Sequence, residues 1–282
     1  MNVELTSLDR VLWPETGFTK ADLVDYYRAV APALVPHVSG RPLTLGRFPD
    51  GVDAHGFATT ECRGAPDWMS TCTLALRSGG SRRFCVVDDL RSLLWVANLS
   101  AIELHGFLGR AAAVEEPASV LFDLDPGPPA GLAECRAVAL EVRRMVAREG
   151  LDALVKTSGG LGLHVHVPLA AGHSYAQTKR FAREIAESLA ADRPNEVTAR
   201  SEKDARRGKV FVDWLQNDER RTSILPYSLR ATDVPQVSTP VTWDEVEHAA
   251  SLAFSTADVI ARVAALGDPF ASMLGSDQML RG

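Results

Sequence analysis

The chain has 282 residues, of which 46% are hydrophobic and 23% are charged. This composition is typical of a globular protein and excludes a disordered chain, a collagen-like chain and a small disulfide scaffold. The 30 basic and 36 acidic residues give a net charge of −6. A nucleic-acid partner would therefore need a local basic patch, because the overall charge repels a polyanion.

The cysteines and the N-terminal sequence indicate a reducing compartment. None of the cysteines forms a C-x-x-C pair, so a zinc ribbon is not expected. No secretory signal follows Met1, and no apolar run of about 18 residues is present. We therefore expect a cytoplasmic protein with no membrane partner, in which the cysteines are packed thiols and not disulfides. The cysteines are Cys62, Cys72, Cys85 and Cys135.

The first element in the chain is a helix that begins at a capping box. Thr19 offers a hydroxyl cap, with Asp22 three residues later as its acidic partner. We expect Pro32 to end or kink this helix near Ala31, because proline lacks the backbone donor that a helix interior needs.

The later elements alternate between strands and helices. Short apolar runs bounded by turn residues predict strands at residues 41–48, 83–88, 120–124, 153–157, 163–169, 209–215 and 222–225. Helical spacing or capping boxes predict helices at residues 90–105 and 133–149, and from Ser174, Thr242 and Ser255. Since neighbouring strands form apparent hairpins, this pattern favours a mixed α/β (α+β) fold over a doubly wound parallel sheet.

The first candidate site is a pair of acids in the stretch FDLDPG. Asp123 and Asp125 would point to the same face of a strand. Two carboxylates there are suited to holding hard cations, and paired cations stabilise the attacking and leaving oxygens of a phosphoryl transfer. The alternative is an ordinary strand end, in which the aspartates favour the turn at Pro126-Gly127.

A third acid, Asp213, lies inside the apolar run KVFVDWLQN. A buried carboxylate is costly unless it is paired or binds a metal ion. If Asp213 meets Asp123 and Asp125, the three acids define a metal site. The alternative is a solvent-facing position on a half-buried strand.

A glycine turn is the next candidate. Gly159, Gly160 and Gly162 permit a tight turn whose N–H groups can face an anion. His164 and His166 then share one face of the following strand, where an imidazole can bind phosphate or metal. The alternatives are a simple hairpin, a metal pair of another enzyme class, and polar residues of an ordinary strand.

Basic residues cluster at several places despite the negative net charge. Such clusters are commonly solvated faces, but some of these flank the acidic strands and are consistent with a channel for a phosphate backbone. The clusters are Arg77, Arg82 and Arg83; Arg200, Lys203, Arg206, Arg207 and Lys209; and Arg220 and Arg221. Trp13, Phe57 and Trp68 are candidate stacking surfaces, although aromatic side chains are commonly buried.

In this order, the motifs resemble the polymerase domain of the bacterial DNA ligase D of non-homologous end joining, in the archaeo-eukaryotic primase superfamily. The resemblance covers nearly the whole chain and is carried by LTSLDRVLWPETGFTKADLVDYYRAVAPALVPHVSGRPLTL, AIELHGFLGR, FDLDPG, TSGGLGLHVHVPL, KVFVDWLQN and SILPYSLRA. It implies two packed mixed sheets, one of them a catalytic sheet resembling an RNA-recognition motif, in a stand-alone polymerase domain. We expect a single domain with modules at about residues 1–118 and 119–240, and terminal helices at about 241–282.

The resemblance also implies roles for individual residues. The three aspartates match the family's metal-binding acids, with Mn²⁺ or Mg²⁺ as the cofactor. Residues of the glycine turn and the SILPYSLRA stretch match the nucleotide-binding set, which is Ser158, Gly159, Gly160, His164 and Arg230. A pocket for the 5′-phosphate across a DNA gap matches Lys20 and Arg10, and Phe57 matches the first of two phenylalanines that touch the template.

Three positions depart from the family pattern. Leu161, Gly46 and Thr60 stand where relatives commonly carry lysine. Each lost charged contact is typically worth about 1.5–3 kcal/mol, so nucleotide or DNA binding is expected to be weaker.

The main hypothesis is a nucleotidyltransferase that fills gaps and extends broken DNA ends with NTP or dNTP, on the bacterial nucleoid, with Ku and a separate ligase as partners. One alternative is a weakened or inactive scaffold that binds 5′-phosphate ends. Another is a metal-dependent nuclease or phosphatase, although no dedicated general base for water is evident.

Overall fold

The computed structural model describes residues 3–75 and 79–281. The chain divides into two compact units. The first unit comprises Met1–Ala112, Thr222–Ser238 and Phe254–Asp268, and the second comprises Ala113–Arg221, Thr239–Ala253 and Pro269–Gly282. The sequence-based modules placed residues 222–238 with the catalytic sheet. The structure places them in the first unit, because the strand at 222–224 pairs with a strand of that unit.

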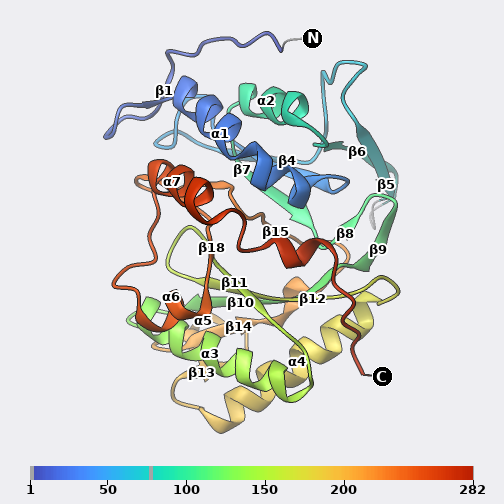
Figure 1. Ribbon diagram of the computed structural model, residues 1–282, viewed down its shortest axis with the longest axis vertical. Helices are drawn as coiled ribbons and strands as arrows, with labels where there is room; N and C mark the ends of the chain where they lie inside the picture. The colour runs from blue at the N-terminus through green and yellow to red at the C-terminus, as the bar shows by residue number, and fades with distance from the viewer. Residues whose placement is uncertain (1–2, 76–78, 282) are drawn as a thin grey trace. The chain divides into compact units, whose positions relative to one another are not determined.

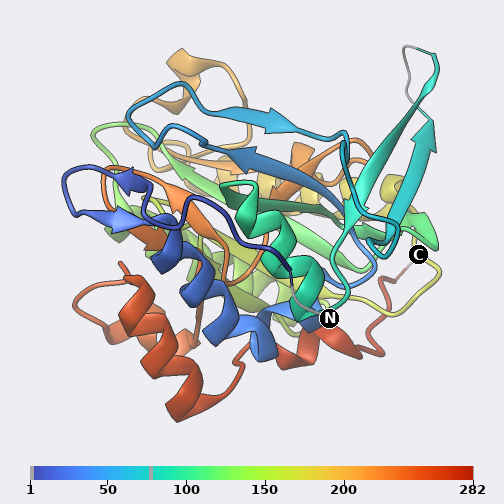
Figure 2. The same cartoon turned by 90° about the horizontal axis from the view of Figure 1, so that it is seen from above.

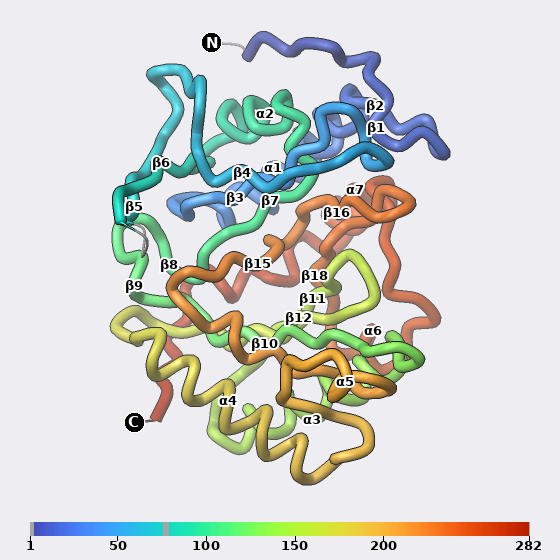
Figure 3. The backbone as a smooth tube through the Cα atoms, turned by 180° about the vertical axis from the view of Figure 1, so that it is seen from behind, coloured from blue at the N-terminus to red at the C-terminus, as the bar shows by residue number. Residues whose placement is uncertain are grey.

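The first unit is built around an antiparallel sheet with strand order β15-β7-β3-β6-β5, and β4 also pairs with β3 (Figure 3). Helices α1 and α2 pack against each other (Figure 2). The strands are β1 (Val11–Trp13), β2 (Phe18–Thr19), β3 (Pro42–Arg47), β4 (Phe57–Thr59), β5 (Thr71–Ala75), β6 (Ser81–Val86), β7 (Ala101–Phe107), β8 (Gly109–Arg110), β15 (Thr222–Ile224), β16 (Leu229–Ala231) and β17 (Pro235–Val237). The helices are α1 (Lys20–Val38), α2 (Leu90–Asn98) and α7 (Thr256–Leu266).

Helix α1 begins as expected and ends later than expected. The Thr19 hydroxyl accepts a hydrogen bond from the backbone N–H of Asp22, and the Asp22 carboxylate accepts one from the N–H of Thr19. The expected end near Pro32 is wrong, because the helix continues through Pro32 and Pro36 to Val38. Its buried face continues on both sides of Pro32. We attribute the continuation to this packing, which offsets the lost backbone donors.

The predicted helix at residues 90–105 is instead a helix followed by a strand. Helix α2 ends at Asn98, and β7 begins at Ala101. Ser100 has φ 55°, a left-handed conformation that breaks the helix. The error arises because a short, mostly apolar stretch fits a buried strand and a buried helix about equally well.

The second unit is built around a mixed sheet with strand order β13-β14-β10-β12-β11-β18. Only the β13–β14 pair of this order is parallel among the described strands. The strands are β9 (Ala113–Pro117), β10 (Ser119–Pro126), β11 (Leu154–Thr157), β12 (Leu163–Pro168), β13 (Val197–Thr198), β14 (Val210–Asp213) and β18 (Pro240–Val241). The helices are α3 (Leu132–Arg148), α4 (Tyr175–Asp192), α5 (Lys203–Arg206) and α6 (Trp243–His248), with 3-10 turns at Trp214–Gln216 and Ala271–Leu274.

Helices α3 and α4 cover one face of this second sheet (Figure 1). Phe122 and Leu124 of β10 are fully buried, and the Phe122 ring lies 6.5 Å from the ring of Phe181 on α4. Because side chains alternate along a strand, Asp123 and Asp125 lie on the opposite face of the sheet. The packing of α3 and α4 thus determines which face carries the acids.

The cysteine prediction is wrong for one pair. Cys62 and Cys85 form a disulfide that joins β6 to the segment after β4, while Cys72 and Cys135 are free thiols. Neither bonded cysteine belongs to a recognisable sequence motif, so composition and spacing gave no signal for the pair.

None of the helices in the described ranges is long and apolar enough to cross a bilayer.

Candidate functional site

The second sheet carries a row of polar side chains that crosses four of its strands. Asp213 on β14 is the register partner of Asp123 on β10, which is also the partner of His164 on β12. His164 is in turn the partner of Lys156 on β11. Directly opposed residues of antiparallel strands project from the same face. The row therefore brings together residues more than 80 positions apart in the chain on the face opposite α3 and α4.

Asp123 lies at the centre of this row and contacts a histidine. Its Oδ1 lies 3.2 Å from Nε2 of His164, and both side chains are largely buried. Burial, together with the charge of Asp123, raises the pKa of the Asp213 carboxyl, although hydrogen bonds from Gln216 and Leu215 oppose the increase. Two carboxylates so placed repel each other when both are ionised, and a cation relieves that repulsion.

Asp125 lies two residues further along β10 and is more exposed, with 47% of its side chain accessible. Its Oδ2 lies 3.9 Å from Nη1 of Arg206, whose guanidinium stacks 3.9 Å from the centroid of the Phe211 ring. The strand register thus brings Asp125 to the same face as Asp123, but its carboxylate is oriented towards a cationic side chain.

The acids share a face without forming a closed metal cage. Over the residues that the structure describes, no three His, Cys, Asp or Glu side chains are grouped so that they could hold a metal ion. Both carboxylate oxygens of Asp213 accept hydrogen bonds, one from the N–H of Leu215 at 3.0 Å and one from the Gln216 amide at 2.9 Å. The donor set is nevertheless made of carboxylate oxygens, which Mg²⁺ and Mn²⁺ prefer.

The glycine turn between β11 and β12 is held by Ser158. Its hydroxyl oxygen accepts from the N–H groups of Gly160 and Gly162, each at 3.2 Å. Gly159 has φ 81°, a left-handed backbone conformation that glycine adopts at little cost because it has no Cβ. Leu161 is 68% exposed at the turn. The sequence prediction assigned these N–H groups to a phosphate, whereas here Ser158 occupies two of them.

Replacing Gly162 by alanine is expected to destabilise the turn. An ideal Cβ on Gly162 would lie 2.5 Å from the carbonyl oxygen of Leu124, so the backbone of β10 or of the turn must shift. Forced shifts of this kind cost about 1–3 kcal/mol, which urea denaturation can measure.

Gly160→Ala is the matched control for that substitution. Its Cβ would have only an ordinary contact with the Ser158 hydroxyl, at 3.7 Å. Equal unfolding free energies for the two variants would contradict the proposed close approach of Gly162 to β10.

Asn217 is a residue that the sequence analysis missed. Its amide donates to the carbonyl oxygen of Leu121 at 2.7 Å and accepts from the Leu121 N–H at 2.9 Å. Strand β14 ends at Asp213 and does not extend alongside Leu121, so the Asn217 side chain pairs with both backbone groups of Leu121 in its place. These two hydrogen bonds support the strand register in which Asp213 lies directly across from Asp123. A fully buried asparagine four residues after an acid is a weak signal, because its partner cannot be inferred from sequence.

Arg230 lies in the first unit, in a separate polar cluster. Its Nε is 3.4 Å from Oε1 of Glu103, which also accepts from the N–H of Ala231 at 3.1 Å. The other carboxylate oxygen of Glu103, Oε2, lies 2.8 Å from Nε2 of His105. Burial alone would raise the pKa of Glu103, but the His105 hydrogen bond and the Arg230 charge outweigh it and lower the pKa. Glu103 was missed by the sequence analysis, although an acid within the apolar run AIELHGF was a possible signal.

Gly46 on β3 also belongs to the surroundings of Glu103. A Cβ on Gly46 would lie 2.8 Å from the Cβ of Glu103. Any side chain at this position, including the lysine expected from the family resemblance, would therefore press on Glu103 unless one of the two strands shifted.

The predicted 5′-phosphate residues also lie in the first unit. Lys20 is only 4% exposed, and its Nζ donates to the carbonyl oxygen of Thr6 at 2.7 Å. Burial lowers the pKa of Lys20, and the charges of Arg10 and Arg47 lower it further. The Arg10 guanidinium donates to the carbonyl oxygen of Pro49. The structure thus gathers three cations, Lys20, Arg10 and Arg47, in one region of the first unit.

The mixed sheet with paired acids defines the class of α/β primase-polymerase domains, and comparison with known proteins identifies the family. The family model described as "LigD, primase-polymerase domain" matches residues 19–270. The chain belongs to this family.

Similar proteins include the multifunctional non-homologous end joining DNA repair protein LigD of Mycobacterium tuberculosis strain H37Rv. It is 39% identical over 277 residues, which cover 94% of this chain and 36% of the relative. LigD of Mycolicibacterium smegmatis is 39% identical over 86% of this chain and 32% of its own length. The chain therefore spans about a third of the length of these relatives. The solved polymerase domain of Mycobacterium tuberculosis ligase D in complex with DNA has a TM-score of 0.92 at 36% identity, and the match covers 98% of this chain and 99% of that one.

Proposed function

We propose that the chain is a nucleotidyltransferase that extends a DNA primer strand from NTP or dNTP, filling gaps and adding nucleotides at broken ends in non-homologous end joining. One observation carries the proposal. In a chain of the LigD primase-polymerase family, Asp213, Asp123 and His164 form a row on one sheet face. The strand that carries His164 directly follows a glycine turn, whose backbone N–H groups are hydrogen-bond donors.

Asp123, Asp125 and Asp213 would hold Mn²⁺ or Mg²⁺ in this proposal. When bound, such ions lower the pKa of a primer 3′-hydroxyl and neutralise the departing pyrophosphate. The raised pKa of Asp213 supports this assignment, because it reflects a site in which negative charge is costly without a cation.

His164 and Ser158 would bind the triphosphate of the incoming nucleotide. His164 is buried against Asp123, so its ring is fixed in orientation and can donate to a phosphate oxygen when protonated. Ser158 would exchange its hydrogen bonds with the N–H groups of Gly160 and Gly162 for bonds to phosphate, which leaves those N–H groups to the same anion.

The first unit would bind the DNA. The Lys20 ammonium has three donors, of which one is used by Thr6, so the others can bind the 5′-phosphate together with Arg10. Phe57, which is 44% exposed, would contact the template strand. Ku and a separate DNA ligase are proposed as partners on the nucleoid, on the strength of the family alone.

The experiment is primer extension by the full chain on gapped DNA that carries a recessed 5′-phosphate. We expect labelled primer to lengthen, and pyrophosphate to be released, in the presence of Mn²⁺ or Mg²⁺ and a nucleoside triphosphate. Cleavage of the labelled strand without pyrophosphate would instead indicate a nuclease.

One observation favours a second candidate, a scaffold that binds 5′-phosphate ends with little or no activity. Leu161 occupies an exposed position in the glycine turn where relatives commonly have a phosphate-facing lysine. Binding of 5′-phosphorylated ends with no extension at any Mn²⁺ concentration would support this scaffold over the polymerase.

A further inference from the structure

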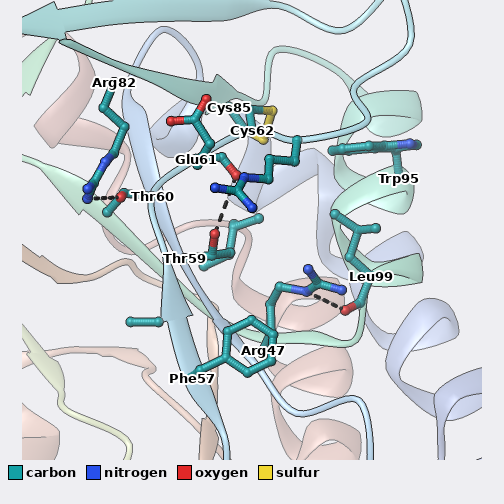
Figure 4. Close-up of a pocket in the computed structure, with 13 residues that line it drawn as sticks. Arg47, Phe57, Thr59, Thr60, Glu61, Cys62, Arg82, Cys85, Trp95 and Leu99 are labelled. Atoms are coloured by element: carbon teal, nitrogen blue, oxygen red, sulfur yellow. Dashed lines mark hydrogen bonds between the residues drawn. A yellow bond between two sulfur atoms is a disulfide. The ribbon is translucent and has the colours of Figure 1, made fainter. Parts of the chain in front are cut away.

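A cavity of about 400 Å³ in the first unit is lined by side chains that include Arg47, Phe57 and Arg82 (Figure 4). Because Phe57 lines it, this cavity belongs to the DNA-binding surface proposed above. The second unit carries a separate feature with no assigned role. It consists of the extended segment at residues 276–280 and a buried histidine, His173, that holds this segment in place.

Residues 276–280 form a strap across the open end of the hairpin of β11 and β12. The Gln278 amide donates to the carbonyl oxygens of Asp152, just before β11, at 3.1 Å and of Pro168, at the end of β12, at 2.9 Å. The carbonyl oxygen of Gln278 accepts from the N–H of Ala170 at 2.9 Å. Alternate residues of the strap are less exposed, as in an extended segment with one side against the protein. The strap thus ties together the two strand ends that lie opposite the glycine turn.

His173 fastens the last residue of the strap. Its side chain is buried, at 2% exposure. Its Nδ1 lies 3.0 Å from the carbonyl oxygen of Ala170, and its Nε2 lies 3.1 Å from the backbone nitrogen of Leu280. A carbonyl oxygen only accepts and a backbone N–H only donates. The ring therefore carries its proton on Nδ1 and accepts at Nε2, so the docked strap requires a neutral imidazole.

A protonated His173 ring is unable to make both of these bonds. An imidazolium has two N–H donors and no acceptor, so its Nε2–H would face the N–H of Leu280. A backbone donor that loses its partner at a buried site is costly. The docked strap therefore binds fewer protons than the released strap. Docking is consequently favoured at higher pH and is weakened as the pH falls.

The charged groups on the neighbouring elements do not pair with His173. Over the residues that the structure describes, no carboxylate forms an ion pair with its ring. Glu116 of β9 instead accepts from the N–H of Gly172 at 2.9 Å. No anion is therefore in place to hold the protonated ring. The other titratable groups on β9, on the first two turns of α4 and at residues 276–281 are Glu115, Tyr175, Lys179, Arg180, Asp277 and Arg281, of which Lys179 and Arg180 pair with Asp218 and Glu184.

We propose that residues 276–280 are a pH-sensitive strap, which is docked on the β11–β12 hairpin while His173 is neutral and is released when His173 is protonated. Release removes the cross-links between the open ends of the two strands. Since His164 lies on β12, the strap braces the hairpin that carries part of the candidate site. The inference concerns the strap alone and does not depend on nucleotidyltransferase activity.

Amide hydrogen exchange of the full chain, measured by NMR as protection factors that correct for the intrinsic pH dependence of exchange, tests the strap. We expect the protection of the Leu280 amide to fall about 10-fold between about pH 8 and pH 5, as loss of one hydrogen bond at a buried site implies. The Ala170 amide, which donates to Gln278, should lose protection in parallel because the strap leaves as a unit. The nitrogen chemical shifts of the His173 ring should report the Nδ1–H tautomer at the higher pH.

His173→Gln is the test variant. A glutamine amide oxygen can accept from the Leu280 N–H and does not titrate in this pH range, so the protection of Leu280 should no longer depend on pH. His248→Gln is the matched control, because His248 is an exposed histidine on α6 of the same unit. This variant should keep the pH dependence of the wild type.

Four outcomes would overturn the inference. The first is protection of Leu280 that does not change with pH in the wild type, and the second is pH dependence that persists in His173→Gln. Loss of protection at Leu280 with none at Ala170 would show local fraying and not release of a strap. An equal loss at the Leu169 amide, which donates to the carbonyl oxygen of Ala118 at 2.9 Å, would show general unfolding of the sheet.

Discussion

Asp123→Ala should lower the rate of primer extension by about 1,000-fold or more, because loss of a metal-binding carboxylate removes several kcal/mol of transition-state stabilisation. Asp123 is expected to be the most sensitive of the three acids. It lies between Asp213 and His164 in the cross-strand row, so its removal affects both sides. Single-turnover extension with saturating DNA and Mn²⁺ measures the effect.

Direct titration of Mn²⁺ into the nucleotide-free chain separates the metal site from the chemistry. Asp123→Ala should weaken Mn²⁺ binding, while Asp152→Asn, at an exposed acid of the same unit, should leave both binding and extension unchanged. Extension that persists in both Asp123→Ala and Asp125→Ala would eliminate the proposed metal site.

Loss of the Cys62–Cys85 disulfide should lower the free energy of unfolding by about 3 kcal/mol, as the chain-entropy relation gives for a closed loop of this size. The bonded residues are 23 positions apart. Cys85→Ser is the test variant, and urea denaturation without reductant is the measurement. Cys72→Ser is the control, since Cys72 is a free thiol on the neighbouring strand β5.

Alkylation of the denatured chain provides an independent check on the same bond. We expect Cys72 and Cys135 to react without reductant and all the cysteines to react after treatment with a dithiol. Reaction of Cys62 and Cys85 in the absence of reductant, or equal stability of Cys85→Ser and Cys72→Ser, would refute the prediction.

Local patterns were sufficient to predict much of the second unit. The alternation in FDLDPG placed Asp123 and Asp125 on one face, because a strand has a period of two, and the capping box at Ser174 correctly marked the start of α4. The mixed α/β class followed from the alternation of elements. These features depend on residues that are near one another in the chain.

Features that depend on distant pairing could not be predicted in this way. The contact of Asp123 with His164 depends on the register between β10 and β12, which no local signal specifies. The same holds for the ion pair of Glu103 and Arg230, which are more than 100 residues apart. The prediction of one helix at residues 90–105 failed for another reason, since a short, mostly apolar stretch does not distinguish the helical period from the strand period.

The discontinuous make-up of the two units has a consequence for how this polypeptide can be divided. A fragment that ends at residue 221 would lack β15, leaving one edge of β7 without its partner, and would also lack α7. A fragment that starts at residue 113 would carry β15 and α7 without the strands and helices they pack on. No single cut yields an intact half, so neither unit can be expressed whole as one uninterrupted stretch of this polypeptide.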